Sequence, residues 1–205
     1  MGKNKVVNNI TAAILAGGKN SRMSGFNKAL IEINGITIIQ KTIKILQGIF
    51  GEIIIITNSP EEFKLFEKET TIVADTIKNS GPLGGMHAAL SVTSKKAVFF
   101  VACDMPFLHN ALILRQLKDF ERTNCECLVP RIGNSIEPLH AVYKKALEGK
   151  IESFLKESTD YSVRSFLETV NVCYWDLKNS RMNREIFKNL NTKEDLEKTI
   201  RSLCG

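Results

Sequence analysis

Two short apolar runs, Ile53–Ile56 and Ala97–Ala102, constrain the fold of this chain most strongly. Neither run alternates with polar residues, so each predicts a strand that is covered on both faces, as in parallel sheets. Ala12–Leu15 is a similar run, and it enters a turn at Gly17-Gly18. Helical patterns lie between these strands. The sequence therefore predicts right-handed βαβ units, with helices on both faces of a mostly parallel sheet.

Apolar periodicity and cap residues predict the remaining elements. Thr37 is the expected cap of a helix that continues to Ile49. The segment Gly81–Gly85 is expected to be a loop that feeds a helix. The other expected helices are Pro60–Glu67, Met86–Val92, His109–Arg122, Lys144–Glu157, Val163–Thr169 and Thr192–Leu203. The other expected strands are Thr71–Ala74, Cys125–Pro130, Leu139–Tyr143 and Val172–Leu177. We expect a single α/β domain, a Rossmann-like three-layer sandwich, over residues 11–205, with residues 1–10 as an N-terminal extension.

Composition limits the class of protein. Of 205 residues, 43% are apolar and 24% are charged, which is typical of a globular protein and excludes disordered and fibrous chains. No apolar run approaches the roughly 20 residues that span a bilayer, and Met1–Asn9 lacks a signal-peptide core. A cytoplasmic protein without membrane contacts is expected. The net charge of +6 favours anionic ligands, but no basic stripe with aromatic residues indicates nucleic acid. The basic segment Lys178–Lys188 is interpreted as a solvated face, with an anion-binding site as the alternative.

The cysteines predict neither a disulfide framework nor a zinc site. The chain has five cysteines, an odd number, and no pair in the C-x-x-C spacing. Its three histidines lie far from any cysteine cluster. Cys125 and Cys127 are expected to share one face of a strand as small core residues.

Three chemically rich stretches follow predicted strands, at the sheet edge where open α/β sheets bind ligands. In the first, Gly17 and Gly18 permit close backbone approach to anionic oxygens, and Arg22 and Lys28 add positive charge. This combination suits a polyphosphate. The stretch is neither a Walker A loop, because Asn20 stands where Ser or Thr is needed, nor a G-x-G-x-x-G motif.

The other two stretches begin with carboxylates. Asp75 is either a surface or capping group, or an acceptor for the N–H donors of a base or for a ribose hydroxyl. Asp104 directly follows the most apolar strand, where a carboxylate must be solvated, paired or bound to a metal. Mg²⁺ takes one or two carboxylates together with phosphate oxygens. A turn-forming role before Pro106 is the alternative for Asp104.

Three downstream residues are weaker candidates. Glu137 either lines a pocket or is an exposed charge, and His140 is interpreted as a core histidine with satisfied hydrogen bonds. Asn191 either completes a metal or phosphate shell or shapes the turn before a helix capped by Thr192. No local motif suggests a nucleophilic side chain, so the chemistry indicated is charge neutralisation around phosphates.

Leu15-Ala16-Gly17-Gly18, Arg22-Met23 and Lys28 resemble the L-A-G-G-x-x-x-R-M-G-x-x-K signature of GT-A-like nucleotidyltransferases. Within that superfamily, the ordered set of motifs is most similar to the molybdenum cofactor guanylyltransferases. The later motifs of this set are Asp75, Gly81–Gly85, Cys103–Pro106, Glu137–His140 and Asn189–Thr192. The likeness extends from Thr11 to Ile200. One departure is Ser24, which stands where the family has glycine.

The resemblance implies a GT-A-type fold and transfer of GMP from MgGTP to the terminal phosphate of molybdopterin or molybdenum cofactor, with release of pyrophosphate. The implied cofactor is Mg²⁺, held by Asp104 with Asn191 as a second candidate ligand. Arg22, Lys28 and Asp104 would be the catalytic residues. The implied nucleotide-binding residues are Leu15, Ala16, Gly17, Gly18, Lys28, Asn58, Asp75, Gly84 and Asp104.

The substrates expected as partners are GTP and molybdopterin or molybdenum cofactor, together with proteins that deliver the pterin. A monomer or weak oligomer is expected. Three alternatives remain open at this point: a cytidylyltransferase acting on the same pterin, a related sugar-phosphate nucleotidyltransferase, and a nucleotide-binding module without catalysis.

Overall fold

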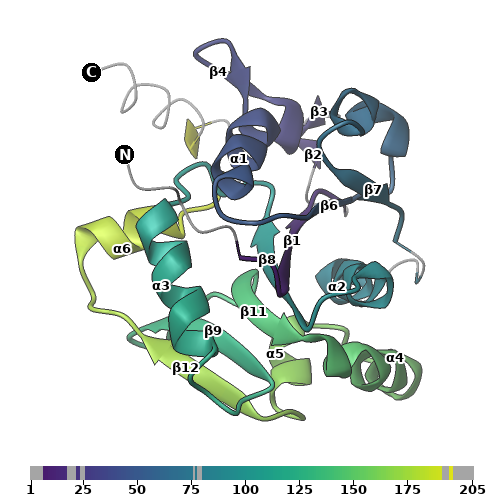
Figure 1. The fold of residues 1–205 in the computed structure, drawn as a ribbon, viewed down its shortest axis with the longest axis vertical. Coiled ribbons are helices and arrows are strands. Elements are labelled where there is room, and N and C mark those ends of the chain that lie inside the picture. Colours follow the sequence, from purple (N-terminus) through teal and green to yellow (C-terminus); the bar gives the residue numbers. More distant parts are fainter. Residues whose placement is uncertain are drawn as a thin grey trace.

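A computed structural model of the chain describes residues 7–17, 22–23, 26–75, 77, 80–190 and 194–195. Figure 1 shows a central sheet with helices on both faces. The strands are β1 Ile10–Leu15, β2 Arg22–Met23, β3 Phe26–Asn27, β4 Glu32–Ile33, β5 Ile36–Thr37, β6 Ile53–Ile56, β7 Thr71–Val73, β8 Ala97–Ala102, β9 Cys127–Ile132, β10 Ser135–Ile136, β11 His140–Lys144 and β12 Val172–Asp176. The α-helices are α1 Ile38–Gln47, α2 Gly81–Val92, α3 Asn110–Phe120, α4 Glu148–Glu157, α5 Val163–Leu167 and α6 Arg181–Ile186. The 3-10 helices are η2 Lys28–Leu30, η3 Pro60–Phe66 and η4 Lys145–Leu147.

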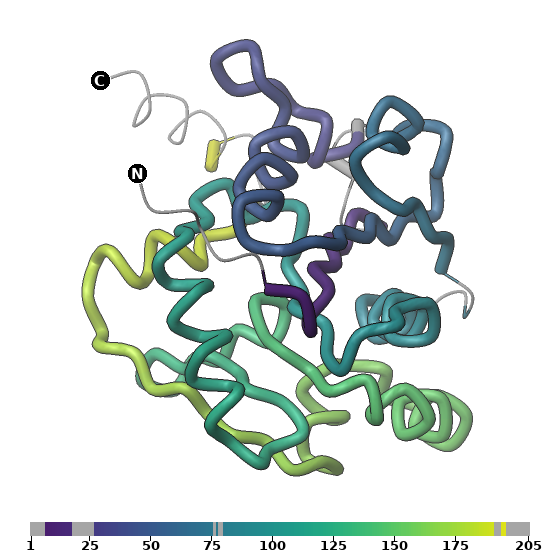
Figure 2. Tube along the Cα trace, viewed as in Figure 1, coloured from purple at the N-terminus to yellow at the C-terminus, as the bar shows by residue number. Residues whose placement is uncertain are grey.

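Within the described ranges, the main sheet has the order β10-β9-β11-β8-β1-β6-β7, and β12 pairs with β9. The pairs β8–β1, β1–β6, β6–β7 and β9–β12 are parallel, which confirms the expectation of a mostly parallel sheet. β11 is antiparallel to both of its neighbours, β8 and β9. Figure 2 shows that the first part of the chain, purple to blue, forms one side of the molecule, and the green to yellow part forms the other.

The core consists of two apolar layers, one on each face of the sheet. Side chains of α1, α3 and η3 pack on one face, and side chains of α2, α4 and α5 pack on the other. Successive residues of β1 alternate between the layers, with Ala12 and Ile14 in the first and Ala13 and Leu15 in the second. The expected three-layer α/β sandwich in one domain is therefore confirmed. No helix in the described ranges is long and apolar enough to span a bilayer.

Two local expectations, the cap of α1 and the solvated basic face of α6, are confirmed by the structure, which also shows a tight turn before α1. Thr37 caps α1, and Gln40 completes a capping box with it. Asn34 and Gly35 form the tight turn between β4 and β5, and their φ angles of 55° and 76° are those of a hairpin turn with positive φ at both central residues. In the segment Lys178–Lys188, Arg181 and Arg184 on α6 are exposed, as a solvated face requires.

Three expected elements differ from the structure, and a fourth is not tested by it. The loop predicted at Gly81–Gly85 is wrong because α2 begins at Gly81, and Pro82 suits a first helical turn, where its missing N–H costs nothing. The helix expected over Pro60–Glu67 is the 3-10 helix η3, and the one expected from Lys144 begins as the 3-10 helix η4 before α4. The expected helix Thr192–Leu203 falls almost entirely outside the described residues.

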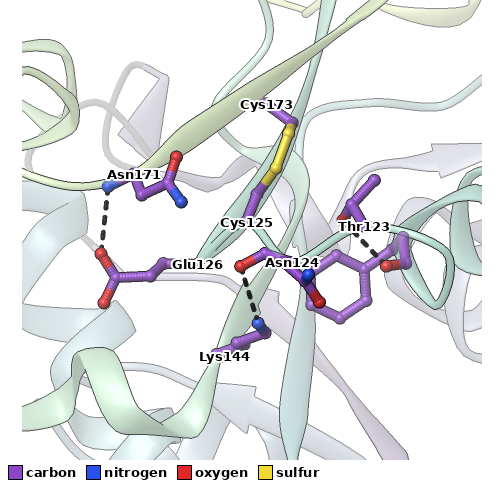
Figure 3. The surroundings of a disulfide bond; sticks show 8 residues. Thr123, Asn124, Cys125, Glu126, Lys144, Asn171 and Cys173 are labelled. Atoms are coloured by element: carbon purple, nitrogen blue, oxygen red, sulfur yellow. Dashed lines mark hydrogen bonds between the residues drawn. A yellow bond between two sulfur atoms is a disulfide. The ribbon is translucent and has the colours of Figure 1, made fainter.

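The prediction for the cysteines is wrong at Cys125. Cys125 and Cys173 form a disulfide bond, with their Cα atoms 5.7 Å apart, just before β9 and within β12 (Figure 3). The two positions are distant in sequence but adjacent in space because β12 pairs with β9 in parallel, a long-range pairing that cysteine spacing does not reveal. Cys127 is buried as a free thiol, as predicted.

His140 is a core residue, as predicted, but its hydrogen bonds are not satisfied. Its ring packs edge-on against Phe99 and Phe187, with ring centroids 5.0 Å away in each case. Neither ring nitrogen has a hydrogen-bond partner among the described residues. Burial lowers the pKa of the imidazole to about 4, so the ring is neutral at pH 7.

Candidate active site

The carboxyl ends of β1, β6 and β8 lie at one edge of the sheet, as their parallel pairing requires. Backbone hydrogen bonds extend the pairing beyond the strands. The N–H of Ala16 donates to the carbonyl of Ile56 over 2.8 Å, and the N–H of Cys103 donates to that of Leu15 over 3.1 Å. The segments that follow these strands therefore lie side by side, where sheets of this kind bind ligands.

The loop after β1 lies against the segment after β6. A Cβ atom on Gly17 would lie 3.5 Å from both the backbone nitrogen and Nδ2 of Asn58, which is van der Waals contact. The structure thus brings together Leu15, Ala16, Gly17 and Asn58, four of the predicted nucleotide-binding residues. The fifth residue of this region, Gly18, lies outside the described residues.

Asp75 and Gly84 are in close contact. A Cβ atom on Gly84 would come within 2.9 and 3.0 Å of the two Asp75 carboxylate oxygens and within 2.8 Å of the Ile77 carbonyl oxygen. Any side chain at position 84 would therefore displace this carboxylate. The Ile77 N–H donates to Asp75 Oδ1 over 3.0 Å, which fixes the carboxylate from the other side.

The environment of Asp75 also sets its charge. Partial burial raises the pKa of the Asp75 carboxyl, while the Ile77 N–H and the nearby His87 lower it. α2 begins at the same edge because it follows β7 along the chain. Its N-terminus carries the positive end of the helix dipole, which favours anions there.

Lys28 and Asp104 interact electrostatically across the same edge. Lys28 is buried, with only 4% of its surface exposed. Burial raises the pKa of the Asp104 carboxyl, and the Lys28 ammonium opposes that rise. The same ammonium acts on the Cys103 thiol, but burial nevertheless raises the pKa of this thiol to about 12, so Cys103 is an unreactive thiol.

The surroundings of Asp104 fit a magnesium ion. Its Oδ1 atom is buried and has no hydrogen-bond partner among the described residues. In the same part of the chain, no group of three or more His, Cys, Asp or Glu residues could hold a metal by itself. A single carboxylate suits Mg²⁺, which retains water and takes phosphate oxygens, and does not suit a closed zinc site.

The two other predicted residues of the catalytic and metal groups are described incompletely. Arg22 is described in its backbone, which pairs with Asn27 in the short β2–β3 hairpin just before Lys28. Asn191 lies outside the described residues. The sequence interpretation passed over its neighbour Asn189, whose Oδ1 is buried without a partner among the described residues. The Leu190 N–H donates to the Asp104 carbonyl over 2.9 Å, so Asn189 lies close to Asp104. The Asn189–Thr192 motif, which contains both asparagines, is the sequence signal that could have identified Asn189.

Beyond Asp104, the edge continues onto β11. The N–H of Ala102 donates to the carbonyl of Leu139 over 3.0 Å, so the segment that begins at Glu137 lies beside the end of β8. Tyr143 holds this segment by donating its hydroxyl to the Pro138 carbonyl over 2.9 Å. Burial raises the pKa of Glu137, and Arg164 of α5 lowers it.

Two surface depressions flank this arrangement. One, of about 380 Å³, is lined by Arg131, Gly133, Asn134, Ile136, Arg164, Glu168 and Tyr174. It adjoins the ends of β9 and β12 on the same sheet edge as Asp104. The other, of about 580 Å³, lies between α1 and η3, and none of the predicted site residues lines it. The predicted site residues therefore lie outside the larger of these two depressions.

Sequence comparison finds known proteins that are similar to this chain. Residues 12–173 match the model of the MobA-like NTP transferase domain. The probable molybdenum cofactor guanylyltransferase of Peptoclostridium acidaminophilum is 38% identical over 196 residues, covering 91% of this chain and 86% of that protein. The molybdenum cofactor guanylyltransferase of Syntrophotalea carbinolica is 34% identical over 198 residues, which cover 95% of this chain and 92% of that protein.

A solved structure supports the fold. The molybdopterin-guanine dinucleotide biosynthesis protein A of Archaeoglobus fulgidus superposes with a TM-score of 0.78 at 23% identity, covering 95% of this chain and 98% of that one. The match to the domain model spans most of this chain, and the two relatives cover it almost completely. The chain therefore belongs to the MobA-like NTP transferase family, and it is a nucleotidyltransferase.

Proposed function

We propose that this chain transfers GMP from GTP to the terminal phosphate of molybdopterin or its molybdenum-loaded form. An acceptor phosphate oxygen attacks the α-phosphorus of GTP, the bond from that phosphorus to the bridging oxygen breaks, and pyrophosphate leaves. The observation that carries the proposal is the electrostatic pairing of Lys28 with Asp104 at the sheet edge that also holds Gly17 and Asp75. The names of the similar proteins support guanine and the pterin as substrates.

The nucleotide is proposed to lie over the ends of β1, β6 and β7. Backbone groups of Leu15–Gly17 would hold it, and Asn58 and Asp75 would contact the base or ribose. A carboxylate matches the paired N–H donors of guanine, and the contacts of Asp75 with Ile77 and Gly84 hold it in one orientation. The N-terminus of α2 adds a favourable field for the phosphates.

Charge neutralisation supplies the catalysis in this proposal. The acceptor phosphate is already a nucleophile, so a general base is dispensable, and the barrier comes from repulsion between anions and from charge on the departing pyrophosphate. Arg22 would stabilise that charge, and Lys28 would bind the same phosphates about equally well in bound GTP and in the transition state. Asp104 would hold Mg²⁺ together with phosphate oxygens, and the ion would neutralise charge on them when bound. Because Lys28 is buried, its ammonium acts in a medium that screens it less than water does.

The acceptor is proposed to lie on the remaining part of the edge, over β11 and β9. Asp104 separates this part from the nucleotide side, since β8 lies between β1 and β11 in the sheet. The depression lined by Arg131, Arg164 and Tyr174 offers cationic and aromatic groups there. Those groups suit an anionic, flat heterocycle better than a plain sugar phosphate.

The test is a reaction with GTP, MgCl₂ and molybdopterin, followed by mass spectrometry of the dinucleotide and assay of pyrophosphate. Stoichiometric product with GTP, and little with CTP, ATP or UTP, is expected. Preferential use of CTP would support a cytidylyltransferase instead. Turnover with a sugar phosphate but not with the pterin would contradict the proposed acceptor.

A binding experiment separates nucleotide choice from acceptor chemistry. Thermal unfolding with each NTP and MgCl₂ needs no pterin, and a ligand present at 100 times its Kd stabilises by about 2.7 kcal/mol. GTP is expected to give the largest shift. Equal shifts with all four nucleotides would contradict recognition of guanine by Asn58 and Asp75.

A further inference from the structure

Lys28 emerges from a short turn that is held by the residue before it. The turn is the 3-10 helix η2, and its N-cap is Asn27, whose Oδ1 atom accepts the Ala29 N–H over 3.1 Å. Asn27 is 9% exposed and Lys28 is 4% exposed, so both lie inside the protein. A buried lysine depends on its surroundings for the direction of its ammonium group, because the side chain itself has four rotatable bonds.

The other end of the Asn27 amide reaches a different part of the chain. Its Nδ2 atom donates to Oε2 of Glu62 over 2.8 Å. Glu62 lies on η3, the element that begins just after Asn58, and its N–H donates to the Ser59 carbonyl over 3.1 Å. One amide group thus connects the lysine turn to the segment proposed to face the base.

The partner element is firmly placed. Phe63 and Phe66 of η3 are buried in the core layer that also contains Ala29. Packing therefore fixes the backbone of η3, from which the exposed Glu62 side chain extends. Asn27 suits this bond because an amide both accepts from Ala29 and donates to Glu62, whereas a carboxylate only accepts.

We infer that Asn27 and Glu62 are positioning residues, whose hydrogen bond orients the Lys28 ammonium toward Asp104 and the triphosphate. The inference rests on the proposed role of Lys28 in binding phosphate. Neither residue touches the reacting atoms in this account. Their bond sets how strongly a triphosphate binds, and the rate of the bound complex depends on it much less.

An exchange of hydrogen-bond polarity tests the inference. Asn27→Asp places two carboxylates face to face and is expected to raise KM for GTP about tenfold with little change in kcat, since a bond to a charged group is lost. Asn27→Asp combined with Glu62→Gln restores a donor and an acceptor with the same total charge. This double variant is expected to return KM to within about threefold of wild type, because the bond re-forms in reverse.

The chain offers a matched control at the exposed pair Gln47 and Glu69. Gln47 Nε2 donates to Glu69 Oε2 over 3.1 Å, so Gln47→Glu creates the same clash of carboxylates outside the site. This variant is expected to keep the wild-type KM. If Asn27→Asp does not fold, Glu62→Ala leaves the cap of η2 intact and is expected to raise KM by a smaller factor, with an unchanged melting temperature in the absence of ligand.

Inorganic tripolyphosphate with MgCl₂ supplies a readout that does not depend on the base or the pterin. Its thermal stabilisation is expected to shrink in Asn27→Asp and return in the double variant, even if the nucleotide or acceptor has been assigned incorrectly. The inference is overturned if Asn27→Asp retains the wild-type KM and tripolyphosphate shift. It is equally overturned if the double variant remains as impaired as the single one.

Discussion

The two halves of the ligand edge are built in different ways. Over β1, β6 and β7, the candidate contacts come from backbone at Leu15–Gly17 and from Asp75, which Gly84 and Ile77 hold in place. Over β9 and β12, they come from exposed side chains such as Arg131, whose side chain is 38% exposed. Arg131 makes two hydrogen bonds to Asp176, of 2.7 and 2.9 Å. The candidate contacts of the first half are therefore positioned by the backbone of the fold. Those of the second half depend on exposed side chains, which single substitutions can change.

The largest effect is expected from the disulfide, which joins the amino ends of β9 and β12, at the sheet edge opposite the ligand edge. Cys125 and Cys173 are 48 residues apart, and closing a loop of that length stabilises the folded chain by about 4 kcal/mol in the chain-entropy model. Urea denaturation with and without a reductant should show a loss of that order. GTP binding should be unchanged, because the bond lies at the sheet edge opposite the proposed ligands. A wild-type protein whose midpoint ignores the reductant would contradict this expectation, and the double Cys→Ser variant should be insensitive to it.

Asp104 lies between the halves, and Asp104→Ala is expected to lower kcat by at least ~100-fold, the size of a lost electrostatic stabiliser. Steady-state turnover with saturating GTP and MgCl₂ measures it. Glu137→Gln, on the second half, should cause a much smaller loss. A near-normal rate for Asp104→Ala would remove the proposed metal role.

Glycine substitutions compare the rigidity of the halves directly. Gly84→Ala brings a Cβ within 2.8 Å of the Ile77 carbonyl, so Asp75 must move, at a cost of about 2 kcal/mol. GTP should bind more than ~10-fold more weakly by isothermal titration. Gly133→Ala meets no atom within 4 Å, but its φ is +58°. It should lower stability by about 1 kcal/mol and leave GTP affinity unchanged. If Gly84→Ala and Gly133→Ala weaken GTP binding equally, the proposed difference between the two halves of the ligand edge is wrong.

The smallest effect concerns pH and His140. The pKa of its ring is about 4 in the folded chain and 6.5 when unperturbed, so between these values the unfolded chain binds the extra proton. Stability is therefore lost as the pH falls from 6.5 toward 4, by about 1.4 kcal/mol at pH 5.5 relative to pH 7.5. Denaturant titrations at both pH values measure it. His140→Leu should lose less stability between them, and an identical loss would refute the assignment.

The sequence predicted the strands of the first half well because local patterns determine them. Uninterrupted apolar runs identified the parallel strands, and the polar residues after them, Asp75 and Asp104, reach the same edge by topology alone. Thr37 was found from its cap pattern for the same reason.

What the sequence did not reveal depends on contacts between distant segments. The Cys125–Cys173 bond requires the parallel pairing of β9 and β12, and the orphaned nitrogens of His140 follow from how Phe99 and Phe187 enclose it. The hydrogen bond between Asn27 and Glu62 likewise joins two elements that no local pattern connects. The roles proposed for the site residues remain predictions.

The reversed direction of β11 has a consequence for how substrate preference can diversify. Because β11 runs antiparallel to β8 and β9, the connection from Gly133 to Leu139 lies at the ligand edge. This connection joins β9 to β11 and is separate in the chain from the loops that follow β1, β6 and β7. Insertions or deletions in that connection would reshape the proposed acceptor site without shifting the register of the strands beneath the proposed nucleotide site. Acceptor preference could thus change during evolution while the mode of nucleoside triphosphate binding stays the same.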